Sequence, residues 1–237
     1  MRYHVLAADY DGTLARDGHM ADTTWAALHR LRDSGRQLVM VTGRRLDGWL
    51  SLIREPKLFA RIVAENGALL YRPASADSRV LAPPPPPPFL AALRARGVEP
   101  LVTGRVIVAT LDPHLDTVLQ AIRDLDLELQ VILNRDAVMV LPAGVNKATG
   151  LAAALDELGL SLPAAVGVGD AENDQALLAA CGCGVAVGNA LPELKDAADL
   201  VVAGSDGDGV VELVDRLIAS DLAEVAPRSS PQPARSA

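Results

Sequence analysis

Two acidic side chains stand one residue apart, directly after an apolar segment near the start of the chain. Val5–Ala8 is apolar throughout, and the stretch DYDGT (residues 9–13) follows it. Residues i and i+2 of an extended chain point the same way, so the carboxyl groups of Asp9 and Asp11 can face one site. Gly12 permits a sharp turn there. An ordinary turn rich in Asp and Gly is the alternative for this stretch alone.

Two further stretches carry groups that suit an anion. The apolar segment Gln37–Val41 leads into Thr42, Gly43 and Arg44. A hydroxyl group together with backbone N–H groups at a helix start can hold phosphate oxygens. Lys147 stands at the start of a predicted helix, where a positive charge is unfavourable for the helix dipole unless an anion compensates it. The alternatives are a simple helix cap and a solvated lysine.

A fourth stretch carries a second pair of carboxyl groups. The apolar segment Ala164–Val168 is followed by Asp170 and, four residues later, by Asp174. Carboxylate oxygens in such a pair suit a hard divalent cation, although acids that cap a helix have the same spacing. Each stretch follows a predicted strand or opens a predicted helix. Together they indicate one site at the carboxyl edge of a sheet, where ligands of parallel α/β folds bind.

Short apolar segments alternate with helical patterns, which predicts an α/β fold whose parallel sheet is buried on both faces. Asp22 is expected to cap the first helix, and Gly35 and Gly159 stand where helices should end. The expected strands are Tyr3–Ala8, Gln37–Val41, Arg61–Ala64, Ala164–Val168, Gly184–Val187 and Leu200–Val202. The expected helices are Thr23–Ser34, Arg45–Arg54, Lys147–Leu158, Glu172–Ala180, Pro192–Ala197 and Gly209–Ser220.

The middle of the chain breaks this alternation. The six prolines from Pro83 to Pro88 favour a stiff extended segment, or a ligand for a proline-recognising domain. After them we expect helices Phe89–Arg96 and Pro113–Leu125 and strands Arg105–Thr110, Leu129–Asn134 and Ala137–Leu141. We therefore expect a core from residues 1–72 and 143–222 and a small α/β insertion from residues 73–142. Residues 223–237 are rich in Pro and Ser and are expected to form a disordered tail.

Composition restricts the partners. The chain of 237 residues has a formal net charge of −8, which argues against nonspecific binding to nucleic acid or to an anionic membrane. Cys181 and Cys183 are too close in sequence for an unstrained disulfide and lack a second pair for zinc, so we expect buried thiols. The chain shows neither a signal-like start nor a long uncharged apolar segment, which favours the cytoplasm. The sequence leaves the oligomeric state open.

Taken together, the four stretches resemble the haloacid dehalogenase (HAD) superfamily of phosphohydrolases. DYDGT matches its first motif, Thr42 its second, Lys147 its third and GDAEND (residues 169–174) its fourth. AENGALL (residues 64–70) resembles the segment before the cap in the Cof-like branch. The resemblance covers nearly the whole chain apart from the tail. It implies a Rossmann-like core, a type-II cap between the second and third motifs, and a phosphatase similar to those acting on phosphoglycolate or sugar phosphates.

The resemblance implies a two-step hydrolysis through an aspartyl-phosphate. Asp9 is the expected nucleophile, and Asp11 is the expected general acid and then general base. Mg²⁺ is the expected cofactor, because several carboxylates and a phosphate dianion would otherwise repel one another. Its expected ligands are Asp9, the backbone carbonyl of Asp11 and Asp170. Asp174 belongs to the same metal group, more as a residue that orients the ligands or Lys147 than as a direct ligand.

Other residues are expected to hold the phosphoryl group or to choose the substrate. Thr42 and Lys147 should bind the phosphoryl oxygens, with further contacts from Gly43, Arg44 and Asn173. The cap should close over the site and exclude bulk water. Its candidates for substrate choice are Arg105, Asn134 and Arg135.

The expected partner is a small phosphorylated substrate, and two alternatives remain open. A phosphomutase or phosphotransferase of the same fold would pass the phosphoryl group to another acceptor, and release of free phosphate would separate it from a hydrolase. A regulatory module within a longer protein is the second alternative, suggested by the Pro-rich tail. The intact Asp9, Asp11, Lys147 and Asp170 favour an enzyme.

Overall fold

A mostly parallel sheet forms the larger part of the molecule. The computed structural model describes residues 1–226. Eight strands follow the order β12-β11-β10-β1-β2-β3-β4-β5. Strand β1 (Val5–Ala8) is parallel to β10 (Ala165–Gly169) and to β2 (Gln37–Val41). These three strands end at the same edge, so the residues that follow them meet there.

The parallel strands of the large sheet alternate with helices, as an α/β fold requires. Its remaining strands are β3 (Arg61–Ala64), β4 (Leu69–Arg72), β5 (Asp77–Val80), β11 (Cys183–Ala186) and β12 (Leu200–Val201). The helices around it are α1 (Asp22–Asp33), α2 (Leu46–Leu50), α5 (Lys147–Glu157), α6 (Gln175–Ala180), α7 (Pro192–Ala197) and α8 (Asp206–Ser220). Short 3₁₀ helices are η1 (Pro56–Leu58), η2 (Glu65–Gly67), η3 (Asp112–His114), η4 (Leu162–Ala164) and η5 (Glu172–Asp174).

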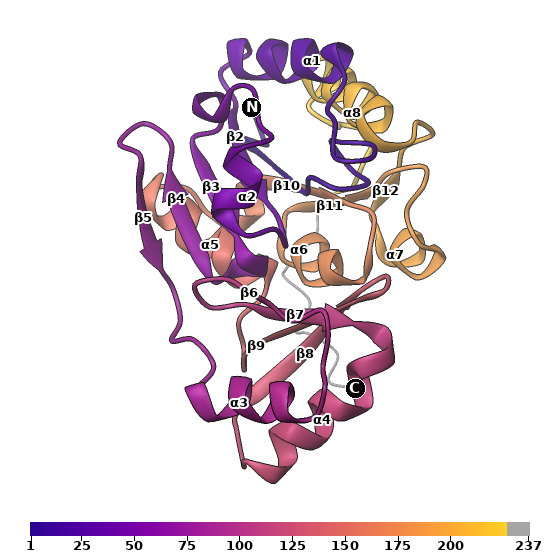
Figure 1. Cartoon of the computed structure of the whole chain (residues 1–237). Helices are drawn as coiled ribbons and strands as arrows, with labels where there is room; N and C mark the ends of the chain where they lie inside the picture. Colours follow the sequence, from indigo (N-terminus) through magenta and orange to yellow (C-terminus); the bar gives the residue numbers. More distant parts are fainter. Residues whose placement is uncertain (227–237) are drawn as a thin grey trace.

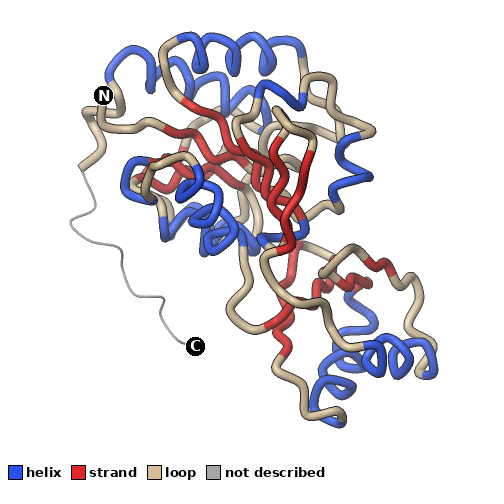
Figure 2. Tube along the Cα trace, turned by 90° about the vertical axis from the view of Figure 1, so that its left-hand side faces the viewer, coloured by secondary structure: helices blue, strands red, loops and turns tan. Residues whose placement is uncertain are grey.

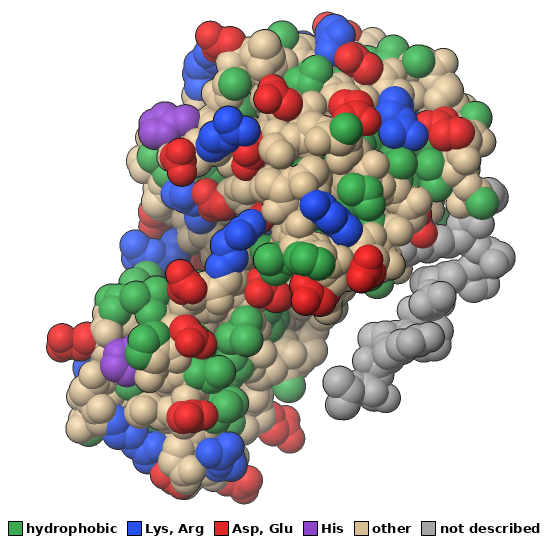
Figure 3. All heavy atoms as spheres, turned by 90° about the vertical axis from the view of Figure 1, so that its right-hand side faces the viewer, with side chains coloured by type: hydrophobic (Ala, Val, Ile, Leu, Met, Phe, Trp, Pro, Cys, Tyr) green, Lys and Arg blue, Asp and Glu red, His purple; other side chains and the backbone are tan. Residues whose placement is uncertain are grey.

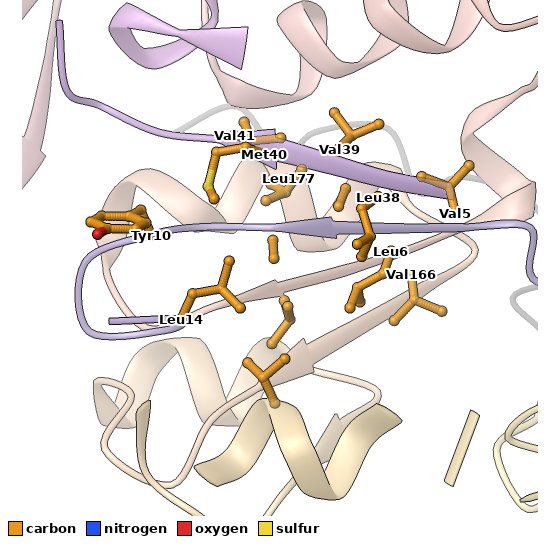
Figure 4. Packing of buried hydrophobic residues seen from close by; sticks show 14 of the residues in the cluster. Val5, Leu6, Tyr10, Leu14, Leu38, Val39, Met40, Val41, Val166 and Leu177 are labelled. Carbon is orange, nitrogen blue, oxygen red and sulfur yellow. The ribbon is translucent and has the colours of Figure 1, made fainter. Parts of the chain in front are cut away.

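Helices cover both faces of the sheet, as Figure 2 shows. Helix α1 packs against α8, and α5 packs against α6. Alternate residues of a strand point to opposite faces, so strands covered on both sides must be apolar throughout. The side chains of Leu38, Val39, Met40 and Val41 on β2 show this alternation in Figure 4, and all four are buried. The predicted α/β fold with a parallel sheet is confirmed.

A second lobe lies below the carboxyl edge of the large sheet in Figure 1. It comprises residues 87–142, and we call it the cap lobe. Its four-stranded antiparallel sheet has the order β6-β7-β9-β8. The strands are β6 (Val102–Thr103), β7 (Val108–Leu111), β8 (Leu129–Asn134) and β9 (Ala137–Pro142), and the helices are α3 (Pro87–Ala95) and α4 (Leu115–Asp124). Phe89, Leu93, Val118 and Val140 belong to its own apolar core.

A buried glutamate joins the two lobes. The Glu65 carboxylate accepts hydrogen bonds from the backbone N–H groups of Arg105, Val106 and Ile107, at 2.9, 2.7 and 3.0 Å. A Cβ on Gly104 would stand 2.6 Å from this carboxylate, so the approach requires glycine. These amides are bound by Glu65 rather than by a neighbouring strand. Strand β7 therefore begins at Val108, and not at residue 105 as the sequence predicted.

Several expected boundaries differ from the structure. Strand β5 pairs with β4 in the large sheet, so a division after residue 72 falls inside a hairpin. Helix α3 begins at Pro87 and not at residue 89, because proline fits the first turn of a helix. The N-cap of α1 is Ala21, and Asp22 is the first helical residue. Gly35 and Gly159 follow the ends of α1 and α5 with positive φ, as predicted.

The expected tail divides into two parts. Residues 223–226 are described, and the Val225 carbonyl accepts a hydrogen bond from Arg2 Nη1 at 3.0 Å, so this short part packs against the fold. Residues 227–237 lie outside the described residues. Cys181 and Cys183 are both buried. Within the described part of the chain, the helices are all too short or too polar to cross a membrane. Acidic and basic side chains are interspersed on the face shown in Figure 3.

Candidate active site

A fully buried lysine lies between two aspartates at the carboxyl edge of the large sheet. Lys147 opens helix α5, and its side chain has no exposed surface. Its ammonium group donates to Asp9 Oδ1 at 2.6 Å and to Asp174 Oδ1 at 2.7 Å. Asn146 caps the helix by accepting from the backbone N–H groups of Ala148 and Thr149. The positive charge at a helix start is thus compensated by carboxylates rather than by solvent.

Asp170 completes a buried acidic cluster with Asp9 and Asp174. Each of the three places a carboxylate oxygen within 4.8 Å of the other two. Asp170 follows β10, and its Oδ1 accepts a hydrogen bond from Thr13 Oγ1 at 3.0 Å. Its carboxyl group lies directly over Gly12, where a Cβ would stand 2.5 Å from Oδ2. Gly12 therefore permits the close approach of the first and fourth motifs, and its φ of +75° favours glycine as well.

The two oxygens of Asp174 are both engaged. Oδ1 accepts from Lys147, and Oδ2 accepts from the backbone N–H groups of Asp170 and Ala171, at 3.1 and 3.2 Å. These contacts fix the loop between β10 and α6 and hold the lysine. Asp174 is therefore placed to orient Asp170 and Lys147, while Asp9 and Asp170 have fewer protein donors.

Burial and like charges govern the ionisation of this cluster. Burial raises the pKa of the Asp9 carboxyl group well above its usual value, and Asp174 and Asp170 add to this effect against the opposing Lys147. Burial also raises the pKa of Asp170, assisted by Asp174 and opposed by Arg135. Burial alone would lower the pKa of Lys147, but Asp174 and Asp9 reverse this and raise it. A divalent cation beside these carboxylates would favour their ionised forms.

Asp11 lies outside this cluster and forms a two-point ion pair. Arg44 Nε and Nη2 each donate to one oxygen of Asp11, both at 2.6 Å. The side chain of Asp11 is 41% exposed, so it faces the open side of the site. The hydrogen bond to Asp11 raises the pKa of Arg44, and the Arg44 guanidinium also lies over the Tyr10 ring. Arg44 is therefore bound to the site and is not a solvated surface residue.

Thr42 and Asn173, two of the expected phosphate-binding residues, are both buried. Thr42 is buried after β2, and its Oγ1 accepts from the Arg44 backbone N–H at 3.1 Å. The amide of Asn173 donates to Asn66 Oδ1 at 3.1 Å. Asn66 Nδ2 and Asn173 Oδ1 are buried and have no hydrogen-bond partner within residues 1–226. A Cβ on Gly43 would lie 3.6 Å from the Asn173 amide nitrogen, so these groups surround the backbone of Gly43.

The two arginines and the asparagine proposed for substrate choice lie in different places. Arg135, in the turn between β8 and β9, donates from Nη2 to Asp170 Oδ2 at 2.6 Å. Arg105 instead donates from Nη1 to Ser78 Oγ at 2.6 Å, on the side of β5. Asn134 ends β8, where its backbone pairs with Ala137. Only Arg135 of these three has a recorded contact with the acidic cluster in residues 1–226.

Sequence reasoning did not assign a role to Thr13, Glu65 or Asn66. Thr13 lies within the first motif, so its bond to Asp170 could have been suspected from the motif itself. Glu65 and Asn66 form a turn with positive φ at both residues. Such a conformation is rare for residues other than glycine, and the sequence AENGA gives only the Asn-Gly pair as a signal of it.

Comparisons with known proteins agree with this site. The family of haloacid dehalogenase-like hydrolases matches residues 6–82 and 103–214. A phosphoglycolate phosphatase of Methanothermobacter thermautotrophicus is 31% identical over 222 residues, which cover 90% of this chain and 98% of that protein. A phosphoglycolate phosphatase of Natronomonas pharaonis is also 31% identical, with 89% and 96% covered.

Solved structures share the fold. A haloacid dehalogenase-like hydrolase from Bacteroides thetaiotaomicron superposes with a TM-score of 0.77 at 22% identity, covering 91% of this chain and 99% of that one. A sugar phosphatase of HAD subclass IIB gives a TM-score of 0.77 at 20% identity, covering 90% and 98%. The chain therefore belongs to the haloacid dehalogenase-like hydrolase family. Within it the chain is a Cof-like phosphatase, a phosphoric monoester hydrolase, as its motifs predicted.

Proposed function

We propose that this phosphatase depends on Mg²⁺ and hydrolyses a small phosphorylated metabolite through an aspartyl-phosphate on Asp9. The main support is the buried cluster at the sheet edge, where Asp9, Asp170 and Asp174 gather within 4.8 Å of one another. A lysine without exposed surface lies among them. Buried charges cost folding free energy even when they are paired. Such an arrangement is therefore expected where it serves a ligand.

Phosphoglycolate is the first substrate that we propose, because relatives that match 90% and 89% of this chain are phosphoglycolate phosphatases. A cavity of about 250 Å³ between the lobes supports a small leaving group. Gly43, Arg44, Arg45 and Gly48 line it from the core, and Val102, Ile107 and Ala109 line it from the cap lobe. The net charge of −8 and the buried thiols support a metabolite enzyme of a reducing cytoplasm.

The carboxylate of Asp9 attacks phosphorus, and the bond to the leaving oxygen breaks as Asp11 supplies a proton to it. The resulting carboxylate of Asp11 then takes a proton from water, which attacks the phosphoryl group and releases phosphate and free Asp9. Thr42, Lys147 and the amide of Asn173 hold the phosphoryl oxygens. Arg44 occupies both oxygens of Asp11 at the open side of the site. Asp11 must therefore leave this ion pair before it can carry the proton that it passes to the leaving alcohol.

The residues present fit Mg²⁺, because the donors are all oxygens and burial raises the pKa values of Asp9 and Asp170, which a cation would offset. Asp9, Asp170 and the Asp11 carbonyl would hold it, and Asp174 would orient them through Lys147 and the Asp170 amide. The cation, when bound, supplies charge neutralisation for the phosphoryl group.

The first test is the release of inorganic phosphate from a panel of phosphate esters, with Mg²⁺ and with EDTA. The panel contains phosphoglycolate, several sugar phosphates and p-nitrophenyl phosphate. We expect turnover only with Mg²⁺, and highest kcat/KM for phosphoglycolate. Absence of release from folded protein with Mg²⁺ would contradict the proposal. Transfer of the phosphoryl group to an added alcohol in preference to water would favour the phosphotransferase alternative.

A further inference from the structure

The hairpin of the cap lobe places one arginine on the acidic cluster. Arg135 lies in the turn between β8 and β9 with a positive φ of 51°. Its guanidinium donates from Nη2 to Asp170 Oδ2 at 2.6 Å, and its backbone N–H donates to Glu172 at 3.1 Å. Strand β8 thereby rests on η5, the short helix after Asp170. The cap lobe thus brings a permanent cation to the edge of the reaction centre.

We propose that Arg135 recognises an anionic group on the leaving portion of the substrate. The site would then select phosphate esters whose leaving portion carries a carboxylate over those whose leaving portion is uncharged. This inference rests on the proposed phosphatase function and adds to it a specificity-determining residue. An arginine guanidinium carries several N–H donors in one plane, which match the two oxygens of a carboxylate.

The position of Arg135 suits a group that reaches beyond the phosphate. Asp9 and Asp170 offer carboxylate oxygens within 4.8 Å of each other, so a guanidinium bonded to Asp170 lies within a small molecule's length of the nucleophile. The side chain of Arg135 is 51% exposed while that of Asp170 is 1% exposed. About half of the arginine side chain is therefore open to solvent, while its backbone N–H is bound by Glu172.

The other cations at the site are already bound to catalytic groups. Lys147 donates to Asp9 and Asp174. Arg44 donates from Nε and from Nη2 to Asp11. Arg135 has Asp170 as its carboxylate partner, and Asp170 is the residue that the proposed function assigns to the cation. When Asp170 serves the cation, the guanidinium of Arg135 is available for a carboxylate of the substrate.

Two further arginines are compared with Arg135 in the experiment, one as a control and one as a rival for the same role. Arg105 is also in the cap lobe, but it turns to Ser78 Oγ and serves as a matched control for the loss of one positive charge. Arg45 lines the cavity between the lobes and donates to the Thr103 carbonyl at 3.3 Å. Arg45 is therefore the rival for the same role.

The kinetic test compares phosphoglycolate with ethyl phosphate, in which a methyl group replaces the carboxylate. In Arg135→Gln we expect kcat/KM for phosphoglycolate to fall about 10- to 100-fold, the size of one charged hydrogen-bonding contact. The value for ethyl phosphate should change less than about threefold. Arg135→Lys should lie between the wild type and Arg135→Gln, since it keeps the charge and loses the planar pair of donors. Arg105→Gln should match the wild type for both esters.

A binding measurement separates recognition from turnover. In the Asp9→Asn background with Mg²⁺, calorimetry should show Kd for phosphoglycolate about 10- to 100-fold higher when Arg135→Gln is added. Kd for ethyl phosphate should stay unchanged. Equal losses for both esters would overturn the inference, as would a selective loss in Arg45→Gln with none in Arg135→Gln. If the wild type hydrolyses neither ester nor p-nitrophenyl phosphate, the proposed function fails, and the binding result still decides the role of Arg135.

Discussion

At the scale of single residues, Asp9 is the group on which the proposed chemistry depends. Its carboxylate follows the central strand and accepts from a lysine without exposed surface. Asp9→Asn keeps the shape and removes the nucleophile, so we expect phosphate release to fall by at least about 10³-fold. The melting temperature should change by only a few degrees, because the loss of the Lys147 pairing is partly offset by weaker repulsion from Asp170 and Asp174.

The measurement is single-turnover and steady-state phosphate release, with circular dichroism as the check on folding. Asp17→Asn is the matched control, since Asp17 is exposed on the same loop and its positive φ suits asparagine. We expect wild-type rates for that variant. Hydrolysis by Asp9→Asn at a rate close to the wild type would remove Asp9 as the nucleophile.

The sequence was sufficient to predict that Asp9, Lys147 and Asp170 lie close together. Each follows a strand or opens a helix of one parallel sheet, and parallel strands end at one edge. It was not sufficient to find the partner of Asp11 or the contact of Arg135 with Asp170. Those contacts join residues from separate elements through side chains, and the register of one element on another does not follow from local pattern.

At the scale of elements, the turn at η2 fixes how the chain enters the cap lobe. Glu65 is buried, and three consecutive amides of residues 105–107 donate to its carboxylate. In Glu65→Gln the side-chain NH₂ group would face donors, and at least one charged hydrogen bond would be lost. We expect the free energy of unfolding to fall by about 2–3 kcal/mol. We also expect a higher KM, because the cap lobe would be held less firmly over the site.

Urea unfolding and steady-state kinetics test this prediction. Glu193→Gln is the control, since Glu193 is exposed in the first turn of α7 and should change stability by less than about 1 kcal/mol. If Glu65→Gln and Glu193→Gln were equally stable, the hydrogen bonds to Glu65 would not stabilise the fold, and the prediction would be wrong. The same link explains why residues 105–107 do not belong to a strand, although Val106 and Ile107 are apolar. Periodicity alone could not indicate this.

At the scale of the whole molecule, two lobes meet over a site with excess negative charge. The α/β core was predictable because its strands are apolar on both faces and its helices end at glycines such as Gly35 and Gly159. The short antiparallel strands β4, β5 and β6 were not predicted. Strand β5 is mostly exposed and polar, and β6 has two residues, so neither carries the apolar pattern on which strand prediction relies.

The excess negative charge makes the stability of the whole fold depend on pH and on divalent cation. Folding raises the pKa values of Asp9 and Asp170. Their stabilising contribution is thus fully present below the pKa of an unfolded aspartate and is lost as pH rises through their folded-state values. At neutral pH a bound cation offsets this loss. With Mg²⁺ at about 100 times its Kd we expect the free energy of unfolding to rise by about 2.7 kcal/mol. This corresponds to an increase in Tm of roughly 5–10 °C.

Thermal melts in Mg²⁺ and in EDTA, from about pH 5 to about pH 8, measure the increment in Tm that the cation gives. It should shrink as pH falls, because protons compete with the cation for Asp9 and Asp170, whose raised pKa values bring this competition above the usual range of aspartate. Asp170→Asn should lose most of the increment at neutral pH, since it removes a proposed ligand. An increment that is equal at all pH values, or that persists in Asp170→Asn, would place the cation elsewhere on the molecule.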